Sequence, residues 1–397
     1  MVDVLDSWSD DDGVARATEL FRARFDENPD GVWAAPGRVN VIGEHIDYNG
    51  GPCLPIALPH RTYVALRRRR DTHVRLTSRQ ARPPVWEGDL DDIKPGMAED
   101  WVGYAAGAAR ILLEDGFTVS GFDAAIDSCV PWGAGLSSSA ALECAVGIAL
   151  DDVNNLGLGG DDAGRARLAS ICARAENDIV GAPTGGMDQA ASLRTADGKA
   201  ILLDTLDNSV RQVPLGLDEA GLALLVIDTR APHTLNDGQY AARRDTCERV
   251  ARRLGVRTLR EVVDKPAALA GLTDDVEHRR VRHVFSEIDR VDHLVALVEG
   301  GHVDQIGPLL DASHASLRDD YEVSCPELDL AVETARTQGA IGARMTGGGF
   351  GGSAIAVVPK DHVEPVMTAI DAAFAAHDMN KPVFLVARAA GPATRVA

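Results

Sequence analysis

The chain has 397 residues, 45% hydrophobic and 25% charged, a globular composition with room for two domain cores. Its 60 acidic and 40 basic side chains give a formal charge of −20, which disfavours nucleic acid as a partner because the surface repels phosphate. The acidic N-terminus and the lack of a long apolar run argue against a signal peptide and a membrane span, so we expect a cytoplasmic protein.

The hydrophobic pattern predicts helices and strands in the following chain order. A helix over 13–25 leads to strand-like runs in the first half of 31–51 and at 54–58, 62–67 and 74–76. Next come a helix over 101–113, a strand over 122–130, and helices from 138 and over 163–180. Strands at 200–204 and 222–228 precede helices at 238–254, 278–298, 302–319 and 326–338. A strand at 354–358, a helix at 361–376 and a strand at 382–388 end the chain. This order predicts an α+β fold of two domains, 1–199 and 200–397.

Residues 130–143, VPWGAGLSSSAALE, place a glycine-rich turn between a strand and a helix start. Backbone N–H groups at such a helix start have no partner and converge on one point, which favours a phosphate there. Ser137, Ser138 and Ser139 add hydroxyls that can meet phosphate oxygens or a metal ion. The chain has neither the Walker lysine motif nor the Rossmann glycine fingerprint, so this is a phosphate site of another design.

This stretch and residues 31–51 resemble the GHMP kinases, a family of small-molecule kinases with three motifs. The third motif is MTGGGFGGS at residues 345–353. Within the family, GRVNVIGEHIDYNGG at residues 37–51 is similar to the galactokinase signature, and the resemblance extends essentially from end to end. It implies a mixed-sheet N-terminal domain, a ferredoxin-like split-βαβ C-terminal domain and an active site in the cleft between them.

The resemblance also implies an activity: transfer of the γ-phosphate of MgATP to the anomeric C1 hydroxyl of galactose, giving galactose 1-phosphate. In that reading Asp188 is the catalytic base and Arg38 stabilises the transferred phosphoryl group. The sugar would be held by Glu44, His45, Asp47, Gly185 and Tyr240. Ionised carboxylates are strong acceptors for sugar hydroxyls, which agrees with that set. We expect galactose and MgATP as the partners, and a monomer.

The resemblance assigns a nucleotide and a metal to further residues. ATP would be bound by Gly133, Ala134, Gly135, Leu136, Ser137, Ser138 and Ser139, with Trp101 and Tyr104 flanking the adenine. Mg²⁺ would be bound by Ser139 and Glu176. The helical pattern supports Glu176 independently, because its carboxylate falls at the edge of a buried helix face and needs a partner there.

Three positions depart from the usual galactokinase pattern and leave the sugar range open. Ile46 replaces threonine, Trp132 replaces leucine, and Gly186 replaces an aliphatic residue beside Asp188. The alternatives are a related sugar-1-kinase acting on N-acetylgalactosamine or an arabinose-like pentose, and a non-catalytic galactose sensor. The sensor reading requires loss of part of the serine-alanine run, whereas residues 137–141 are complete here.

Overall fold

The computed structural model describes residues 2–96, 101–182, 184–231 and 238–397. Its largest sheet, here called the N-terminal sheet, has six strands in the order β14-β2-β4-β7-β5-β6. They are β14 (Thr394–Arg395), β2 (Gly31–Asn40), β4 (Pro55–Arg68), β7 (Phe122–Ser128), β5 (His73–Ser78) and β6 (Val85–Asp89). Only the pairing of β5 with β7 is parallel, so the sheet is mixed, as predicted.

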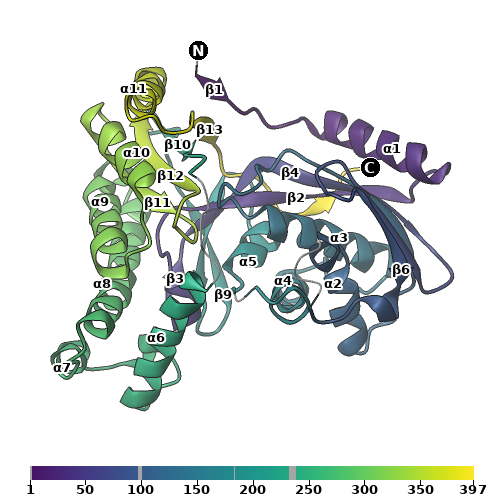
Figure 1. The fold of residues 1–397 in the computed structure, drawn as a ribbon, viewed down its shortest axis with the longest axis horizontal. Coiled ribbons are helices and arrows are strands. Elements are labelled where there is room, and N and C mark those ends of the chain that lie inside the picture. Colours follow the sequence, from purple (N-terminus) through teal and green to yellow (C-terminus); the bar gives the residue numbers. More distant parts are fainter. Residues whose placement is uncertain (1, 97–100, 183, 232–237) are drawn as a thin grey trace.

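Helices cover both faces of the N-terminal sheet (Figure 1). On β2, Val32 and Ala34 face α1 (Asp10–Phe25), whereas Trp33 and Ala35 face a second core under α2 (Trp101–Glu114) and α3 (Ser138–Asn154). Successive side chains of a strand point to opposite faces, so the first half of β2, which is buried on both sides, has no polar side chain. The helices α4 (Asp162–Arg174) and α5 (Met187–Arg194) complete this layer.

A five-stranded C-terminal sheet has the order β1-β13-β10-β12-β11. Its strands are β1 (Asp3–Val4), β13 (Val383–Ala387), β10 (Leu222–Asp228), β12 (Ser353–Pro359) and β11 (Gly342–Thr346). Near it lie α8 (Asp275–Glu299), α9 (Gly307–Ser316), α10 (Pro326–Thr337) and α11 (Val363–Ala376) (Figure 1). A small sheet joins β3 (Pro52–Cys53), β8 (Lys199–Asp204) and β9 (Ser209–Pro214), and α6 (Gln239–Leu254) and α7 (Lys265–Ala270) complete the helices.

Each end of the chain pairs with the sheet of the opposite half. Near the N-terminus, Asp3 pairs with Val383 in the C-terminal sheet, and near the C-terminus Thr394 pairs with Ala34 in the N-terminal sheet. The division into 1–199 and 200–397 stays a prediction. None of the described helices is both long and apolar enough to cross a membrane.

Some predicted elements differ from the structure. The two runs at 54–58 and 62–67 are one strand, β4, that continues through Pro59. The register of β2 against β4 shifts between Pro36 and Arg38, opposite residues 58–60 of β4. This bulge accommodates Pro59, which has no N–H to donate. The helix predicted over 163–180 changes at Ala175 to a π-helix, Ala175–Val180. The one predicted over 302–319 ends in a π-helix, Leu317–Tyr321, that extends past the predicted limit.

Candidate active site

An arginine and an aspartate distant in the sequence form the centre of the site. Arg38, on β2, donates from Nε to Asp188 Oδ1 at 2.7 Å and from Nη2 to Oδ2 at 2.8 Å. Its Nη1 donates to the carbonyl oxygen of Gly135 at 2.6 Å, and Ser137 Oγ donates to Asp188. Asp188 follows Gly186, whose φ of 85° lets the chain turn into α5. The predicted catalytic pair is thus assembled and fixed against the glycine-rich turn.

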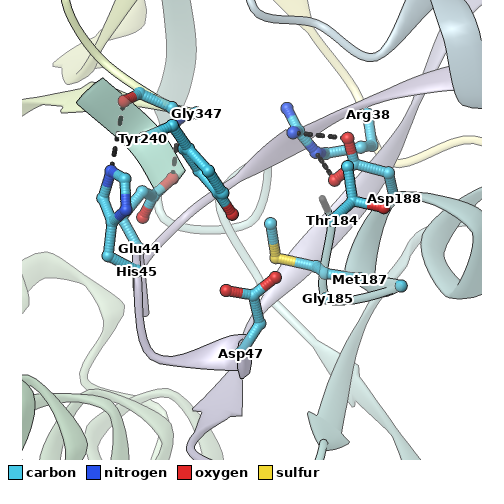
Figure 2. A pocket seen from close by; sticks show the side chains of 12 residues that line it. Arg38, Glu44, His45, Asp47, Thr184, Gly185, Met187, Asp188, Tyr240 and Gly347 are labelled. Atoms are coloured by element: carbon cyan, nitrogen blue, oxygen red, sulfur yellow. Dashed lines mark hydrogen bonds and ion pairs between the residues drawn. The ribbon is translucent and has the colours of Figure 1, made fainter. Parts of the chain in front are cut away.

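A first pocket, of about 190 Å³, lies on one side of this pair (Figure 2). Its lining includes all five predicted sugar-binding residues, Glu44, His45, Asp47, Gly185 and Tyr240. The other lining residues are Arg38, Thr184, Gly186, Met187, Asp188, Gly347 and Gly348. Of these, Thr184, Gly186, Met187, Gly347 and Gly348 were not predicted as site residues. Ile46 is not part of the lining, since its side chain is buried in the main core.

Asp47 and Gly185 both line this first pocket, and the Asp47 carboxylate packs directly against the backbone of Gly185. Burial, and next the charge of Asp188, raise the pKa of Asp47 to about 6. A Cβ atom at Gly185 would collide with the Asp47 carboxylate, so the backbone can approach here only because the residue is glycine. Asp47 is therefore a carboxylate that ionises near neutral pH and is held against a bare stretch of backbone.

The polar atoms of Glu44 are occupied by protein groups. Its Oε1 accepts from Thr346 Oγ1 and from the N–H of Gly347, both at 3.0 Å. Its Oε2 accepts from Asn40 Nδ2 at 2.8 Å and lies 2.5 Å from Nη2 of the fully buried Arg344. Burial raises the pKa of Glu44, and the charge of Arg344 opposes this. The side chain forms part of the first pocket's wall while tying the end of β2 to β11.

His45 is also engaged on both ring nitrogens. Nδ1 lies 2.9 Å from the hydroxyl of Tyr48, and Nε2 lies 3.1 Å from the carbonyl oxygen of Gly348. Burial lowers the pKa of His45 to about 3, so the ring is neutral at pH 7. Tyr240, on α6, packs its ring 5.3 Å from that of His45.

A second pocket, of about 310 Å³, lies along the glycine-rich turn. Its lining is Arg38, Gly133, Gly135, Leu136, Ser137, Ser138, Ser139, Asp188, Thr346, Gly348, Gly349, Gly351 and Gly352. Three residues, Arg38, Asp188 and Gly348, line both pockets, so the two pockets meet at the ion pair. Ala134, predicted to bind ATP, is not in the lining. It is buried, and its carbonyl oxygen accepts a hydrogen bond from Ser353 Oγ at 2.7 Å.

Glu176 lies beside the second pocket, on the π-helix. It accepts from Gln189 Nε2 at 2.7 Å and from Thr184 Oγ1 at 3.2 Å, and Ser139 also hydrogen-bonds to it. Burial, and next the charge of Asp188, raise its pKa to about 7. A cation would relieve this repulsion between carboxylates. In the described part of the chain, no group of three or more His, Cys, Asp or Glu side chains is arranged to hold a metal ion.

The predicted adenine-flanking residues lie outside both pockets. Trp101 donates from Nε1 to the carbonyl of Pro83 at 3.1 Å and lines a narrow space with Trp132 and Ser138. Tyr104, on the same helix, packs against the core beneath the N-terminal sheet, and burial raises its pKa to about 12. Trp132 itself is 63% exposed.

Comparison with known proteins defines the class of protein. A family model described as the GHMP kinases N terminal domain matches residues 103–195, and one described as GHMP kinases C terminal matches residues 294–376. A mevalonate kinase structure, 16% identical, shares the fold with a TM-score of 0.63 over 90% of this chain and 98% of its own. Fold and site together define a GHMP kinase.

More similar proteins narrow the assignment. The galactokinase galactose-binding signature matches residues 19–68. A galactokinase of Streptomyces coelicolor is 49% identical, covering 94% of this chain and 96% of its own, and one of Mycobacterium tuberculosis is 44% identical over 84% and 90%. The structure of Lactococcus lactis galactokinase complexed with galactose, 34% identical, superposes with a TM-score of 0.90 over 96% of this chain and 98% of that one. The chain belongs to the galactokinase family.

Proposed function

We propose that the protein transfers the γ-phosphate of MgATP to the C1 hydroxyl of galactose, giving galactose 1-phosphate and ADP. The observation that carries the proposal is the position of the Arg38–Asp188 pair, where the first pocket and the second pocket meet. Phosphoryl transfer demands mainly that donor and acceptor are held in line and that charge is stabilised. A sugar in the first pocket and phosphates in the second would satisfy that demand.

In the proposed reaction, an oxygen of Asp188 accepts the proton of the C1 hydroxyl. The sugar oxygen then forms a bond to the γ-phosphorus, and the bond from that phosphorus to the β,γ-bridging oxygen breaks, leaving ADP. Arg38 holds the Asp188 carboxylate in place through two hydrogen bonds and, from the same position, can stabilise negative charge on the transferred group. Asp47 and the backbone at Gly185 orient the sugar ring.

Ser139 and Glu176 would hold Mg²⁺ with the phosphates, and the ion would neutralise charge on the β- and γ-phosphate oxygens. The N–H groups around Gly133 and Gly135 and the N-terminus of α3 would bind the phosphates directly.

The proposal is tested by ADP release with ATP, with and without Mg²⁺, across galactose, N-acetylgalactosamine, arabinose, glucose and mannose. We expect Mg²⁺-dependent turnover with the highest kcat/KM for galactose, and phosphate on C1 in the NMR spectrum of the product. A preference for N-acetylgalactosamine or arabinose would move the assignment to a related sugar-1-kinase. Galactose binding without turnover would favour a sensor.

Gly185→Ala is expected to raise the KM for galactose about tenfold or more, since the added methyl would displace the Asp47 carboxylate. Steady-state kinetics at saturating ATP measures this. Gly160→Ala is the matched control, because a Cβ there meets only the carbonyl oxygen of Gly157, at 3.9 Å. An unchanged KM in both variants would mean that Gly185 does not border the bound sugar.

The affinity for galactose is expected to fall below pH 6. The ionised form of Asp47 accepts hydrogen bonds from sugar hydroxyls, and this form is lost as the pH falls through its pKa of about 6. The Kd, measured by titration calorimetry from pH 5 to 8, should be constant above the pKa and rise by up to about tenfold per pH unit below it. Asp47→Asn should bind weakly, without this pH dependence. The same slope in wild type and variant would assign the effect to another group.

A further inference from the structure

Three polar side chains behind the first pocket have no part in the proposed chemistry. Tyr48 lies in the 3₁₀ turn η1 (Asp47–Asn49), Tyr321 ends the π-helix Leu317–Tyr321, and Cys247 lies in α6. The hydroxyls of Tyr48 and Tyr321 are 2.9 Å apart, and the Tyr321 hydroxyl is 3.2 Å from Cys247 Sγ. With His45 and Gly348 they form a continuous hydrogen-bonded chain.

The direction of every hydrogen bond in this chain follows from its last member. The carbonyl oxygen of Gly348 can only accept, so the Nε2 atom of His45 carries the hydrogen. In the neutral ring Nδ1 is then bare and accepts from the Tyr48 hydroxyl. The Tyr48 oxygen in turn accepts from Tyr321, and the Tyr321 oxygen accepts from the Cys247 thiol.

A neutral ring is what the surroundings of His45 favour. Burial is the largest cause of its lowered pKa, and His283, Arg243 and Arg344 add repulsion against a positive charge on the ring. Tyr321 packs its ring 4.9 Å from His45 and 4.5 Å from His283, which leaves little room for either ring to turn.

Gly348 is one of the three residues that line both pockets. We infer that Tyr48 and Tyr321 are positioning residues: through His45 they fix the Gly348 carbonyl, and with it the wall that the sugar pocket and the phosphate pocket share. This inference rests on the proposed kinase function. It differs from the predicted role of His45 as a sugar ligand, because both ring nitrogens are committed to protein groups. Breaking this series of hydrogen bonds should therefore weaken the binding of both substrates together.

The test compares Tyr48→Phe, which should have the larger effect on the KM values, with Tyr321→Phe, which should have the larger effect on stability. Tyr48→Phe leaves His45 Nδ1 without its donor, so the ring can adopt the other tautomer and release Gly348. We expect the KM values for galactose and for ATP each to rise about five- to tenfold, the effect of about one hydrogen bond. Tyr321→Phe leaves the Tyr48 donor in place, so its KM values should rise only about twofold.

Stability should follow burial instead. Tyr321 is fully buried, whereas Tyr48 is half-buried, so Tyr321→Phe should lower the denaturation midpoint more. Tyr63→Phe is the matched control: its buried hydroxyl donates to Asp10 at 3.0 Å, on the α1 side of the N-terminal sheet, and both KM values should stay unchanged. KM changes that follow the loss of stability, or Tyr48→Phe kinetics equal to those of Tyr63→Phe, would overturn the inference.

A second readout does not depend on catalysis. In protein labelled with ¹⁵N-histidine, with the signal assigned through a His45→Gln variant, His45 should show the Nε2–H tautomer at pH 7 and lose that preference in Tyr48→Phe. A protonated ring or the Nδ1–H tautomer in the wild type would overturn the inference. Wild-type protein that has the expected tautomer and yet phosphorylates no sugar would refute the kinase function alone.

Discussion

Asp188→Asn is expected to lower kcat by about 10³-fold or more while galactose still binds. The amide keeps the size of the side chain, and its oxygen, placed where Oδ2 now lies, can still accept hydrogen bonds from Arg38 Nη2 and Ser137. It cannot take the proton of the C1 hydroxyl, and it leaves the nearly buried Arg38 without its ionised partner. Single-turnover kinetics, together with calorimetric titration of galactose, separates loss of chemistry from loss of binding.

The chain offers a matched control for this substitution. Asp162 receives two hydrogen bonds from the nearly buried Arg194, at 2.9 and 2.7 Å, in the same bidentate arrangement. Asp162→Asn should weaken that ion pair and leave kcat close to the wild-type value. If Asp188→Asn kept a near-normal kcat, the role of Asp188 as base would be wrong. If it lost galactose binding as well, Asp188 would be a sugar ligand first.

Arg344→Met is expected to cause the largest loss of stability, about 3–5 kcal/mol in the free energy of unfolding. Arg344 is fully buried in β11, 2.5 Å from Glu44 and 4.0 Å from Glu287, and it also donates to the carbonyl of Val41 at 3.1 Å. Its removal leaves two buried carboxylates facing each other without that charge. The loss should be smaller at pH 5 than at pH 8, because Glu44 can then take up a proton.

Denaturant unfolding followed by tryptophan fluorescence measures this loss. Arg194→Met is the control: Arg194 is also nearly buried, but its partner Asp162 has a side chain that is 62% exposed and water can solvate it. A smaller loss is expected there, because an uncompensated charge at the surface costs little. Equal losses in the two variants would mean that Arg344 stabilises the fold by packing and not by its charge.

Much of the fold was predictable because long elements carry a repeating pattern of apolar residues. The helices α6, α8, α10 and α11 begin and end within three residues of their predicted limits. The helix α5 was missed because it has only eight residues and three of its buried residues, Gln189, Ser192 and Arg194, are polar, which obscures the apolar pattern of a buried helix. The end strands β1 and β14 have two residues each and exist only through pairing with distant strands, which local sequence does not encode.

The candidate site divides in the same way. The motifs predict which segments supply it, and Arg38 and Asp188 do meet, although 150 positions separate them. The sequence does not show which protein groups form hydrogen bonds with each polar atom. Glu44 and His45 read as free sugar ligands, yet their acceptors and donors are engaged with Arg344, Gly347, Gly348 and Tyr48. The sequence does give one signal for a buried ion pair: Arg344 is the one charged residue of the buried strand β11.

The exchange of strands between the chain ends has a mechanical consequence. Because β1 pairs with β13 and β14 pairs with β2, each end of the chain is hydrogen-bonded to the opposite half. The two halves cannot separate while both pairings persist. Any widening of the space between them must come from bending of the sheets or of their connections. Because β1 and β14 have only two residues each, a pulling force on the termini would break these two strand pairings before it strained either core.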